Sequence, residues 1–443
     1  MSTAQPLSAV KQALLEKWHH QIMPQLEQLL QALPEQLVDF SQAEIQIRNG
    51  LLKVARQLLD LWGHVADLKG TRPGCPHCGV SMRHRGLPQT GMVTTVGEVS
   101  YRRPRWRCES CGVECYPHDA VLRFLTHNVS WPLAQVCSRL AAQIPSFDEA
   151  SDTLAEDYRV HLAKETLREI AEAAGSTVLE QEDTRRRRIM ARAEALPESA
   201  QMPEKAFVFA DGTTVHSEGD WHEIRVATVA TEDAAGRPLE RQSRARFLQV
   251  EEVAWTLLLL ARSLGYQNAK HRAFIADGAA WLWKLQETYF ARATPILDWY
   301  HLAEHVHKAA NAVHGQGTPE AQQWAKRLKD ELWAGRAVNA LVLARAELAK
   351  TRAPTKREAL QELVTYLENN QQHMDYPRYR AQGLPVGSGQ VEAQCKTLVG
   401  ARCKQAGMRN WTYRGAEAIL RLRAARQDGS FDGLWRQKLR LAA

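Results

Sequence analysis

The chain has 443 residues, with 57 Lys and Arg against 50 Asp and Glu and a formal net charge of +7. This length suggests about three domains. Hydrophobic residues at 44% and charged residues at 24% are an ordinary globular balance, which excludes wholesale disorder and the collagen and coiled-coil classes. A charge this small indicates a polyanionic partner only if it is clustered.

Residues 1–70 are expected to form a helical region for packing or oligomerisation, because their apolar residues recur at helical spacing. No basic stretch followed by an apolar run marks a secretory signal at the N-terminus. The longest apolar stretch, 253–264, contains Arg262 and is too short to cross a membrane. We therefore expect a cytoplasmic protein with no membrane partner.

Residues 71–120 are predicted to form a zinc ribbon. Two C-x-x-C pairs, each followed by glycine, supply Cys75, Cys78, Cys108 and Cys111. Four thiolates make a closed tetrahedral zinc site, and a glycine suits the tight turn after each pair. A closed ligand set predicts structural rather than catalytic zinc.

Cations interleaved with aromatic residues surround these cysteines. The candidate DNA-binding residues of the ribbon are Arg83, Arg85, Arg102, Arg103, Arg105 and Arg107. Such a surface fits contact with a nucleic-acid backbone. The alternative is an arginine-rich ribbon that engages nothing.

Residues 121–190 are predicted to be a helical DNA-binding segment similar to a helix-turn-helix. A capping box at 146–149 opens one helix, and a second is expected over 163–174, ending at Gly175. Lys164 and Arg168 would lie on the exposed face of the second helix, where a recognition helix needs cations. Any helical hairpin would give a similar pattern. Residues 182–204 are expected to be a charged connector, either solvated or in contact with phosphate.

From residue 205 the pattern becomes rich in strands. Strands are predicted at 206–210, 224–230, 245–250, 271–276 and 294–297, with helices at 253–264 and 279–290. Three consecutive strands followed by alternating units predict a mixed sheet with helices on its faces. Residues 302–375 are expected to be helical.

Two predicted strands run into Asp-Gly, at Asp211 and at Asp277. If each strand ends there, both carboxylates lie at one edge of the sheet and can hold Mg²⁺ or Mn²⁺, as metal-assisted phosphoryl transfer requires. An isolated Asp-Gly is more commonly a turn. Glu392, one turn into a helix after a glycine-rich turn, is the candidate third acid. Basic and aromatic residues that follow it could hold phosphates or stack a base, or form a solvated helix end; they are Lys396, Arg402, Lys404, Arg409 and Trp411.

The blocks VFADGT, FIADGAAWLW, LDWYH and PVGSGQVEAQCKTLVGARCKQAGMRNW occur in this order. They resemble bacterial insertion-sequence transposases related to the Mutator-like group, in particular the ISKra-type branch, from about residue 40 onward. The resemblance implies a ribonuclease-H-like α/β catalytic domain over 205–443, with a helical insertion at about 303–382. Asp211, Asp277 and Glu392 would be its DDE triad holding Mg²⁺. Asp298 and His301 would match a C/D-x-x-H signature that positions the active site or a DNA strand.

The resemblance implies a DNA transposase that cleaves and transfers strands at the ends of an insertion sequence. Its partner would be double-stranded DNA, at element ends and target. A homodimer or higher oligomer is expected because two ends must meet, and a bacterial protein of this kind would join the nucleoid when bound. One alternative is a zinc-ribbon and helix-turn-helix DNA-binding protein with an inactive catalytic domain. A second is a nuclease without strand transfer.

Counting charge by region revises the first impression of a dilute net charge. Residues 381–443 carry 11 Lys and Arg against 4 Asp and Glu, an excess of +7, and residues 71–118 carry 7 against 3, an excess of +4. Two basic surfaces are therefore predicted, with DNA binding that weakens steeply as salt rises.

Overall fold

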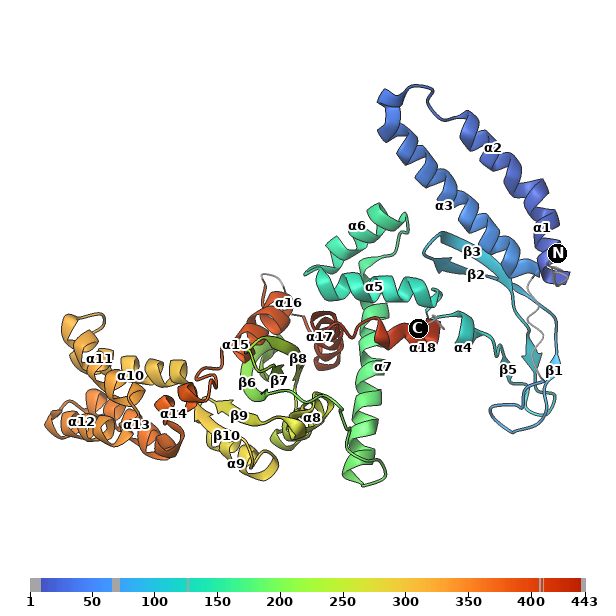
Figure 1. The fold of residues 1–443 in the computed structure, drawn as a ribbon. Coiled ribbons are helices and arrows are strands. Elements are labelled where there is room, and N and C mark those ends of the chain that lie inside the picture. The colour runs from blue at the N-terminus through green and yellow to red at the C-terminus, as the bar shows by residue number, and fades with distance from the viewer. Residues whose placement is uncertain (1–8, 66–71, 126, 406–407, 409, 440–443) are drawn as a thin grey trace. The chain divides into compact units, whose positions relative to one another are not determined.

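The structure, a computed structural model, describes residues 9–65, 72–125, 127–405, 408 and 410–439 (Figure 1). It is a mixed α+β protein, and the chain divides into two compact units. Unit 1 comprises Met1–Ala174 and Asp432–Ala443, and unit 2 comprises Gly175–Phe431. No helix of the described residues combines the length and apolar character needed to cross a membrane.

Unit 1 opens with helices, as the apolar spacing predicted. They are α1 (Ala9–Lys17), the π-helix η1 (Trp18–Ile22), α2 (Met23–Gln31), the 3₁₀ turn η2 (Leu37–Asp39) and α3 (Phe40–Val65). Pro24 lies in the first turn of α2, where the absence of a backbone N–H costs no helical hydrogen bond.

Short strands follow, in the region predicted to be a ribbon. They are β1 (Arg83–His84), β2 (Gln89–Thr94), β3 (Gly97–Arg102), β4 (Trp106–Arg107) and β5 (Glu114–Cys115), before the helical turn α4 (Asp119–Leu122). β2 and β3 form an antiparallel hairpin, and β1, β4 and β5 form a separate three-stranded sheet beside the cysteines.

The helices after the ribbon are α5 (Trp131–Gln143), α6 (Phe147–Tyr158) and α7 (Lys164–Met190), and α7 belongs to unit 2 from Gly175 onward. Unit 1 closes with α18 (Gly433–Leu439). α6 begins where the sequence predicted. Ser146 caps it, because its side-chain oxygen accepts from the backbone N–H groups of Asp148 and Glu149.

The prediction that the second helix ends at Gly175 is wrong. α7 continues to Met190, so the first part of the expected connector at 182–204 is helical. The absence of a side chain at Gly175 serves packing instead. A Cβ there would lie 2.2 Å from the backbone oxygen of Ala418 in α17 (Tyr413–Gln427), so glycine permits the close approach of two helices.

Unit 2 is built on a five-stranded mixed sheet in the order β10-β9-β6-β7-β8. Its elements are β6 (Lys205–Ser217), β7 (Asp220–Glu232), β8 (Pro238–Arg246), α8 (Val250–Ser263), the 3₁₀ turn η3 (Tyr266–Asn268), β9 (His271–Ala276), α9 (Ala280–Tyr289) and β10 (Thr294–Leu297). β6 pairs antiparallel with β7 and parallel with β9, and β9 pairs parallel with β10. The predicted element order and mixed sheet are confirmed. The bounds of the third predicted strand, 245–250, are wrong, because β8 ends at Arg246 and Val250 already begins α8.

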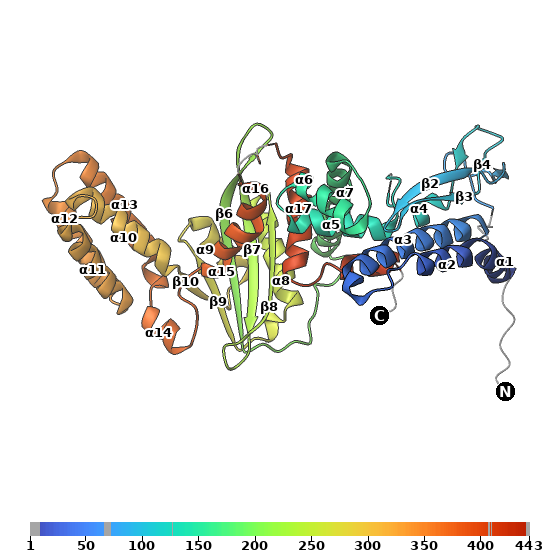
Figure 2. The ribbon, with the colours of Figure 1, turned by 90° about the horizontal axis from the view of Figure 1, so that it is seen from above.

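Helices complete unit 2. After β10 come α10 (Trp299–His314), α11 (Pro319–Trp333), α12 (Ala337–Lys350), α13 (Pro354–Asn370), the 3₁₀ turn η4 (Gln371–His373) and α14 (Tyr376–Ala381), then α15 (Gly389–Gln394), the π-helix η5 (Cys395–Gly400), α16 (Ala401–Cys403) and α17. Figures 1 and 2 show α15 and α17 on one face of the sheet and α8 and α9 on the other. The stretch expected to be helical after β10 is helical.

Candidate active site

Three aspartates lie level with one another on adjacent parallel strands: Asp211 within β6, and Asp277 and Asp298 directly after the ends of β9 and β10. β6 and β9 are paired up to Phe209 and Ile275, and continuing this register by two residues places Asp211 level with Asp277. The register between β9 and β10 places Asp298 level with Asp277 in the same way. Because parallel strands share the direction of their carboxyl ends, the three carboxylates gather at one edge of the β6–β9–β10 part of the sheet.

The prediction that the first strand ends at Asp211 is wrong. β6 continues to Ser217 in register with β7, and Asp211 lies opposite Val226 within that ladder. Asp211 lies at a sheet edge only on the side that faces β9, because the pairing of β6 with β9 ends at Phe209 and Ile275. Sequence reasoning missed this continuation of β6, because Asp-Gly usually forms a turn. Here Gly212 instead pairs with Arg225 within the β6–β7 ladder.

Asp211 and Asp277 are held by neighbours from distant segments. The Cys395 thiol donates to Asp211 Oδ2 at 3.4 Å. Burial raises the pKa of Asp211, and the nearby charge of Asp277 contributes in the same direction. The Tyr366 hydroxyl donates to the backbone oxygen of Asp277 at 2.6 Å, and the Ala279 N–H donates to Asp277 Oδ1 at 2.9 Å.

Asp298 is fully buried and saturated with hydrogen-bond donors. Its Oδ1 accepts from the backbone N–H groups of Tyr300 at 2.6 Å and His301 at 3.4 Å. Its Oδ2 is 3.2 Å from His301 Nδ1 and accepts from the Ser388 N–H at 2.9 Å. Burial alone would raise the pKa of Asp298, but the hydrogen bonds from His301 and Ser388 outweigh burial and lower it. Asp298 therefore ties the start of α10 to the turn that precedes α15.

His301 is a cation among carboxylates. Its hydrogen bond with Asp298 raises the pKa of His301 to about 9, and the charges of Asp277 and Asp211 add to this effect. With its proton retained at neutral pH, the ring is an imidazolium, which donates from both nitrogens.

Glu392 lies on α15, which packs against β6 and β7. Its Oε1 accepts from the Ser388 hydroxyl at 3.3 Å. One ligand atom each of Asp298, His301 and Glu392 lies within 4.8 Å of the others. This grouping could hold a metal, but the oxygens of Asp298 already accept four bonds. We therefore regard Glu392 as the member available to a ligand.

Sequence reasoning missed Cys395, Ser388 and Tyr366 as parts of this site. Cys395 follows Glu392 by three residues, and residues at that spacing share a helix face, so the pattern contained a signal. Cys395 also opens the π-helix η5, a rare element that frequently occurs at functional sites. Nothing local marked Ser388 or Tyr366, because their contacts depend on the fold.

The predicted ribbon cysteines converge on one point. Sγ–Sγ separations are 3.5 Å for Cys75–Cys111, 3.5 Å for Cys78–Cys108 and 3.7 Å for Cys78–Cys111. Four sulfurs arranged tetrahedrally around zinc, each about 2.3 Å from it, are about 3.8 Å apart. Backbone N–H groups within the two turns lower the pKa of Cys75 and bring that of Cys108 to about 6. The four-cysteine cluster could therefore bind a structural metal such as zinc.

Most of the ribbon arginines are engaged by local acids. Arg83 and Arg85 both contact Glu109, at 2.8 and 3.1 Å, and Arg105 contacts Glu114 at 2.6 Å. Arg103 pairs with Asp119. Arg102 and Arg107 are exposed, without an ion pair among the described residues. These acids therefore partly neutralise the excess positive charge that the sequence places in residues 71–118.

The cations expected on a recognition helix are paired as well. Lys164 contacts Asp148 of α6 at 3.0 Å, and Arg168 contacts Glu172 at 2.9 Å within α7. Asp148 is exposed, so a DNA phosphate could compete with it for Lys164 at little cost, whereas Glu172 is half-buried.

The basic residues after Glu392 lie in different environments. Lys396 is exposed, and Lys404 donates to Thr213 of β6, two residues beyond Asp211. Arg402 is buried, with its guanidinium 4.8 Å from the centre of the buried Trp411 ring. This burial disfavours the expectation that either side chain contacts DNA. Arg409 lies outside the described residues.

Part of the C-terminal excess of arginine is engaged inside unit 2. Arg414 contacts Glu180 at 2.5 Å, and the buried Arg421 contacts Glu182 at 2.9 Å, both on α7. Acids of a distant helix therefore offset two of the eleven Lys and Arg of residues 381–443, and the basic surface of this region stays a prediction.

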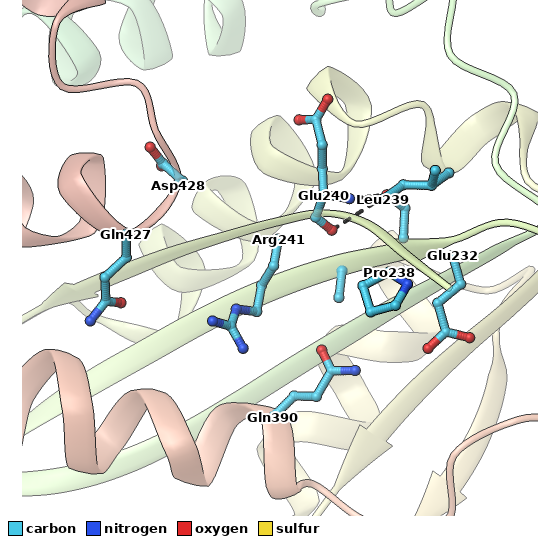
Figure 3. Close-up of a pocket in the computed structure, with 10 residues that line it drawn as sticks. Glu232, Pro238, Leu239, Glu240, Arg241, Gln390, Gln427 and Asp428 are labelled. Carbon is cyan, nitrogen blue, oxygen red and sulfur yellow. Dashed lines mark hydrogen bonds between the residues drawn. The ribbon is translucent and has the colours of Figure 1, made fainter. Parts of the chain in front are cut away.

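A cavity of about 510 Å³ is lined by residues of β7, β8, α15 and α17, among them Gln390, two residues before Glu392. Arg241, Gln390 and Gln427 project toward the space between β8 and the helices α15 and α17 (Figure 3). Its lining residue Glu232 is level with Lys205 on β6, six residues before Asp211, or about 20 Å along the strand. We call Asp211, Asp277, Asp298 and Glu392 the carboxylate group; Asp298 is buried and the other three are half-buried.

Comparison with known proteins identifies one family over most of the chain. The family described as Uncharacterised protein family (UPF0236) matches residues 83–439. No curated protein matches the sequence. The matched range contains the carboxylate group and one of the two cysteine pairs. The chain therefore belongs to the Uncharacterised protein family (UPF0236).

Proposed function

We propose that the chain is a DNA transposase, which cleaves DNA at the ends of an insertion sequence and joins the freed 3′-hydroxyl to target DNA. The level placement of Asp211 and Asp277 on adjacent parallel strands, with the Glu392 helix packed against β6 and β7, carries the proposal. A mixed sheet bearing acids at the ends of parallel strands also supports a ribonuclease-H-like core.

Asp211, Asp277 and Glu392 offer hard carboxylate oxygens, the donor chemistry that fits Mg²⁺ or Mn²⁺. When bound, such ions would supply charge stabilisation for an in-line displacement at phosphorus. Cys395 supports this reading by orienting one Asp211 oxygen, since its thiol donates to Oδ2.

The cations around the carboxylates would position the DNA backbone. His301 carries its charge near Asp277 and Asp211, and Lys404 donates to Thr213 of β6, two residues beyond Asp211. Charged donors of this kind hold phosphate oxygens without reading sequence. Asp298 serves as a positioning residue, because it fixes both the His301 ring and the turn before Glu392.

The test uses the purified full-length chain, Mg²⁺ and a duplex carrying the sequences that flank the gene. We expect Asp211→Asn, Asp277→Asn and Glu392→Gln each to lower strand cleavage at least about 100-fold while leaving DNA binding intact. Glu287→Gln, on the exposed face of α9, is the matched control and should cleave normally.

Cleavage retained in Asp211→Asn would refute the assignment of the acids. Binding by the wild-type chain without any cleavage would favour a DNA-binding regulator. Cleavage without joined product would favour a simple nuclease.

A further inference from the structure

Asp277 lies in a turn where the chain leaves the sheet. β9 pairs with β6 only as far as Ile275 and with β10 only as far as Ala276. The backbone oxygen of Asp277 is therefore beyond both ladders, and strand pairing does not fix the peptide that joins Asp277 to Gly278. Gly278 has a φ of +100°, a conformation that glycine adopts without strain.

The direction of the Asp277 carboxylate depends on the geometry of this turn. Its Oδ1 accepts from the backbone N–H of Ala279, two residues further along, at 2.9 Å. An aspartate that closes a turn in this way keeps its bond only while the intervening peptides hold their orientation. In the described part of the chain, Oδ2 accepts no hydrogen bond, so Oδ2 is the oxygen that a ligand can reach.

A tyrosine of α13 supplies the backbone partner that the strands do not. The Tyr366 hydroxyl donates to the backbone oxygen of Asp277 at 2.6 Å. A Cβ on Gly278 would lie 2.9 Å from Cε2 of the Tyr366 ring and 3.0 Å from Nδ2 of Asn370, so α13 also packs directly on the turn. The peptide after Asp277 is therefore held by a helix that lies about 90 residues further along the chain.

Tyr366 is itself held from two sides. The His305 ring of α10 stacks on the Tyr366 ring, with 3.9 Å between their centroids and 17° between their planes. Asn370 is buried; its Nδ2 donates to the Tyr366 backbone oxygen at 2.9 Å, and its Oδ1 accepts from Nε1 of Trp283 in α9 at 2.7 Å. These contacts fix the Tyr366 hydroxyl relative to α9 and α10.

We infer that Tyr366 is a positioning residue for Asp277, through which the helices that follow β10 aim the second acid at a bound metal ion. The inference rests on the proposed function, because it takes Asp277 to be a metal ligand. Loss of a group that orients a metal ligand lowers metal affinity by about 10- to 100-fold.

The test measures Mn²⁺ binding to the full-length chain, without DNA, from the loss of the paramagnetic resonance signal of the free ion. Tyr366→Phe removes only the hydroxyl and keeps the ring that stacks on His305. It should raise the Mn²⁺ dissociation constant at least about 10-fold. Asp277→Asn removes a ligand charge and should abolish binding at this site.

Tyr379→Phe is the matched control. The Tyr379 hydroxyl also donates to a backbone oxygen of the sheet, that of Pro295 in β10, at 3.2 Å. Pro295 precedes Asp298 by three residues, so this bond does not reach a proposed metal ligand. Both Tyr→Phe variants should lower the midpoint of thermal unfolding by a similar small amount, but only Tyr366→Phe should weaken Mn²⁺ binding.

Two results would overturn the inference while leaving the proposed acids in place. They are unchanged Mn²⁺ affinity in Tyr366→Phe, and an equal loss of affinity in Tyr379→Phe, in each case with binding abolished by Asp277→Asn. Binding that is absent from the wild type, or that persists in Asp277→Asn, would overturn the proposed metal site and with it the role of Tyr366.

Discussion

The cysteine cluster and the carboxylate group are both candidate metal sites, but they are assembled in different ways. Each cysteine pair lies within four residues, and a local backbone bond from His77 N–H to Cys75 Sγ shapes the first turn. Of the proposed metal-binding acids, Asp211 belongs to β6, Asp277 follows β9, and Glu392 belongs to α15. As many as 181 residues separate them along the chain, between Asp211 and Glu392. The first site depends on two turns, and the second depends on sheet register and helix packing.

This difference predicts which of the two sites tolerates substitutions elsewhere in the chain. The cysteine cluster needs only its turns and the short β1-β4-β5 sheet, so distant substitutions should not disturb it. The carboxylate group needs several long-range contacts, so residues that bear no ligand oxygen should still control its geometry. The following predictions test this contrast.

The largest effect is expected from removing one thiolate. Cys108→Ser should abolish zinc binding, because a closed site needs all four ligands and contributes an apparent binding free energy of about 10–16 kcal/mol in zinc-finger peptides. Metal analysis should give about one equivalent for the wild type and none for the variant. Limited proteolysis should then cut within residues 72–118 while unit 2 stays intact.

Cys115→Ser is the control for this experiment. Cys115 packs against the cluster, and its thiol donates to Met82 Sδ at 3.3 Å, but it is not among the four converging cysteines. It should keep its zinc. A variant at Cys108 with full zinc content would contradict the ligand assignment.

The second effect concerns the long-range site. Asp298→Ala should destabilise unit 2 by about 3–5 kcal/mol, because the imidazolium of His301 and the Ser388 N–H lose a buried charged partner. Urea unfolding followed by Trp fluorescence measures the change.

Asp330→Ala removes an exposed carboxylate that pairs with Lys326 within α11. It should alter stability by less than about 1 kcal/mol. An Asp298→Ala variant as stable as Asp330→Ala would show that Asp298 does not couple α10 to the turn before α15.

A smaller effect should follow from Gly175→Ala. The new Cβ would lie 2.2 Å from the Ala418 backbone oxygen, so α7 and α17 must separate, at a cost of about 1–3 kcal/mol. Thermal unfolding should report a lower midpoint. Gly433→Ala in α18, where a Cβ meets no atom within 4 Å, should leave the midpoint unchanged or raise it slightly.

The last prediction is a pH dependence. The pKa of His301 is about 9 in the folded chain, above its usual value near 6.5. The raised pKa contributes stability that is complete below about pH 6.5 and is lost as the pH rises through about 9. Without added divalent metal, the difference in unfolding free energy between the wild type and His301→Gln should therefore shrink between pH 6 and pH 9.5. A constant difference would contradict the ion pair with Asp298.

Much of the fold was predictable where short patterns suffice. The strands β9 and β10 have the predicted bounds, and Ser146 caps α6 as its motif indicated. The errors have a common cause. Gly175 and the Asp-Gly at 211–212 were read as local breaks, but a neighbouring element explains each one: α17 approaches Gly175, and β7 extends the pairing of β6.

The sequence by itself determined the two cysteine turns and the order of strands and helices in unit 2. Only the tertiary structure decided where charge resides. Arg421 and Arg414 look like part of a basic tail, yet α7 supplies Glu182 and Glu180 to meet them. Charges interact through distance in space, and a packed helix can bring acids from 230 residues away to within hydrogen-bond reach, which no count along the chain can show.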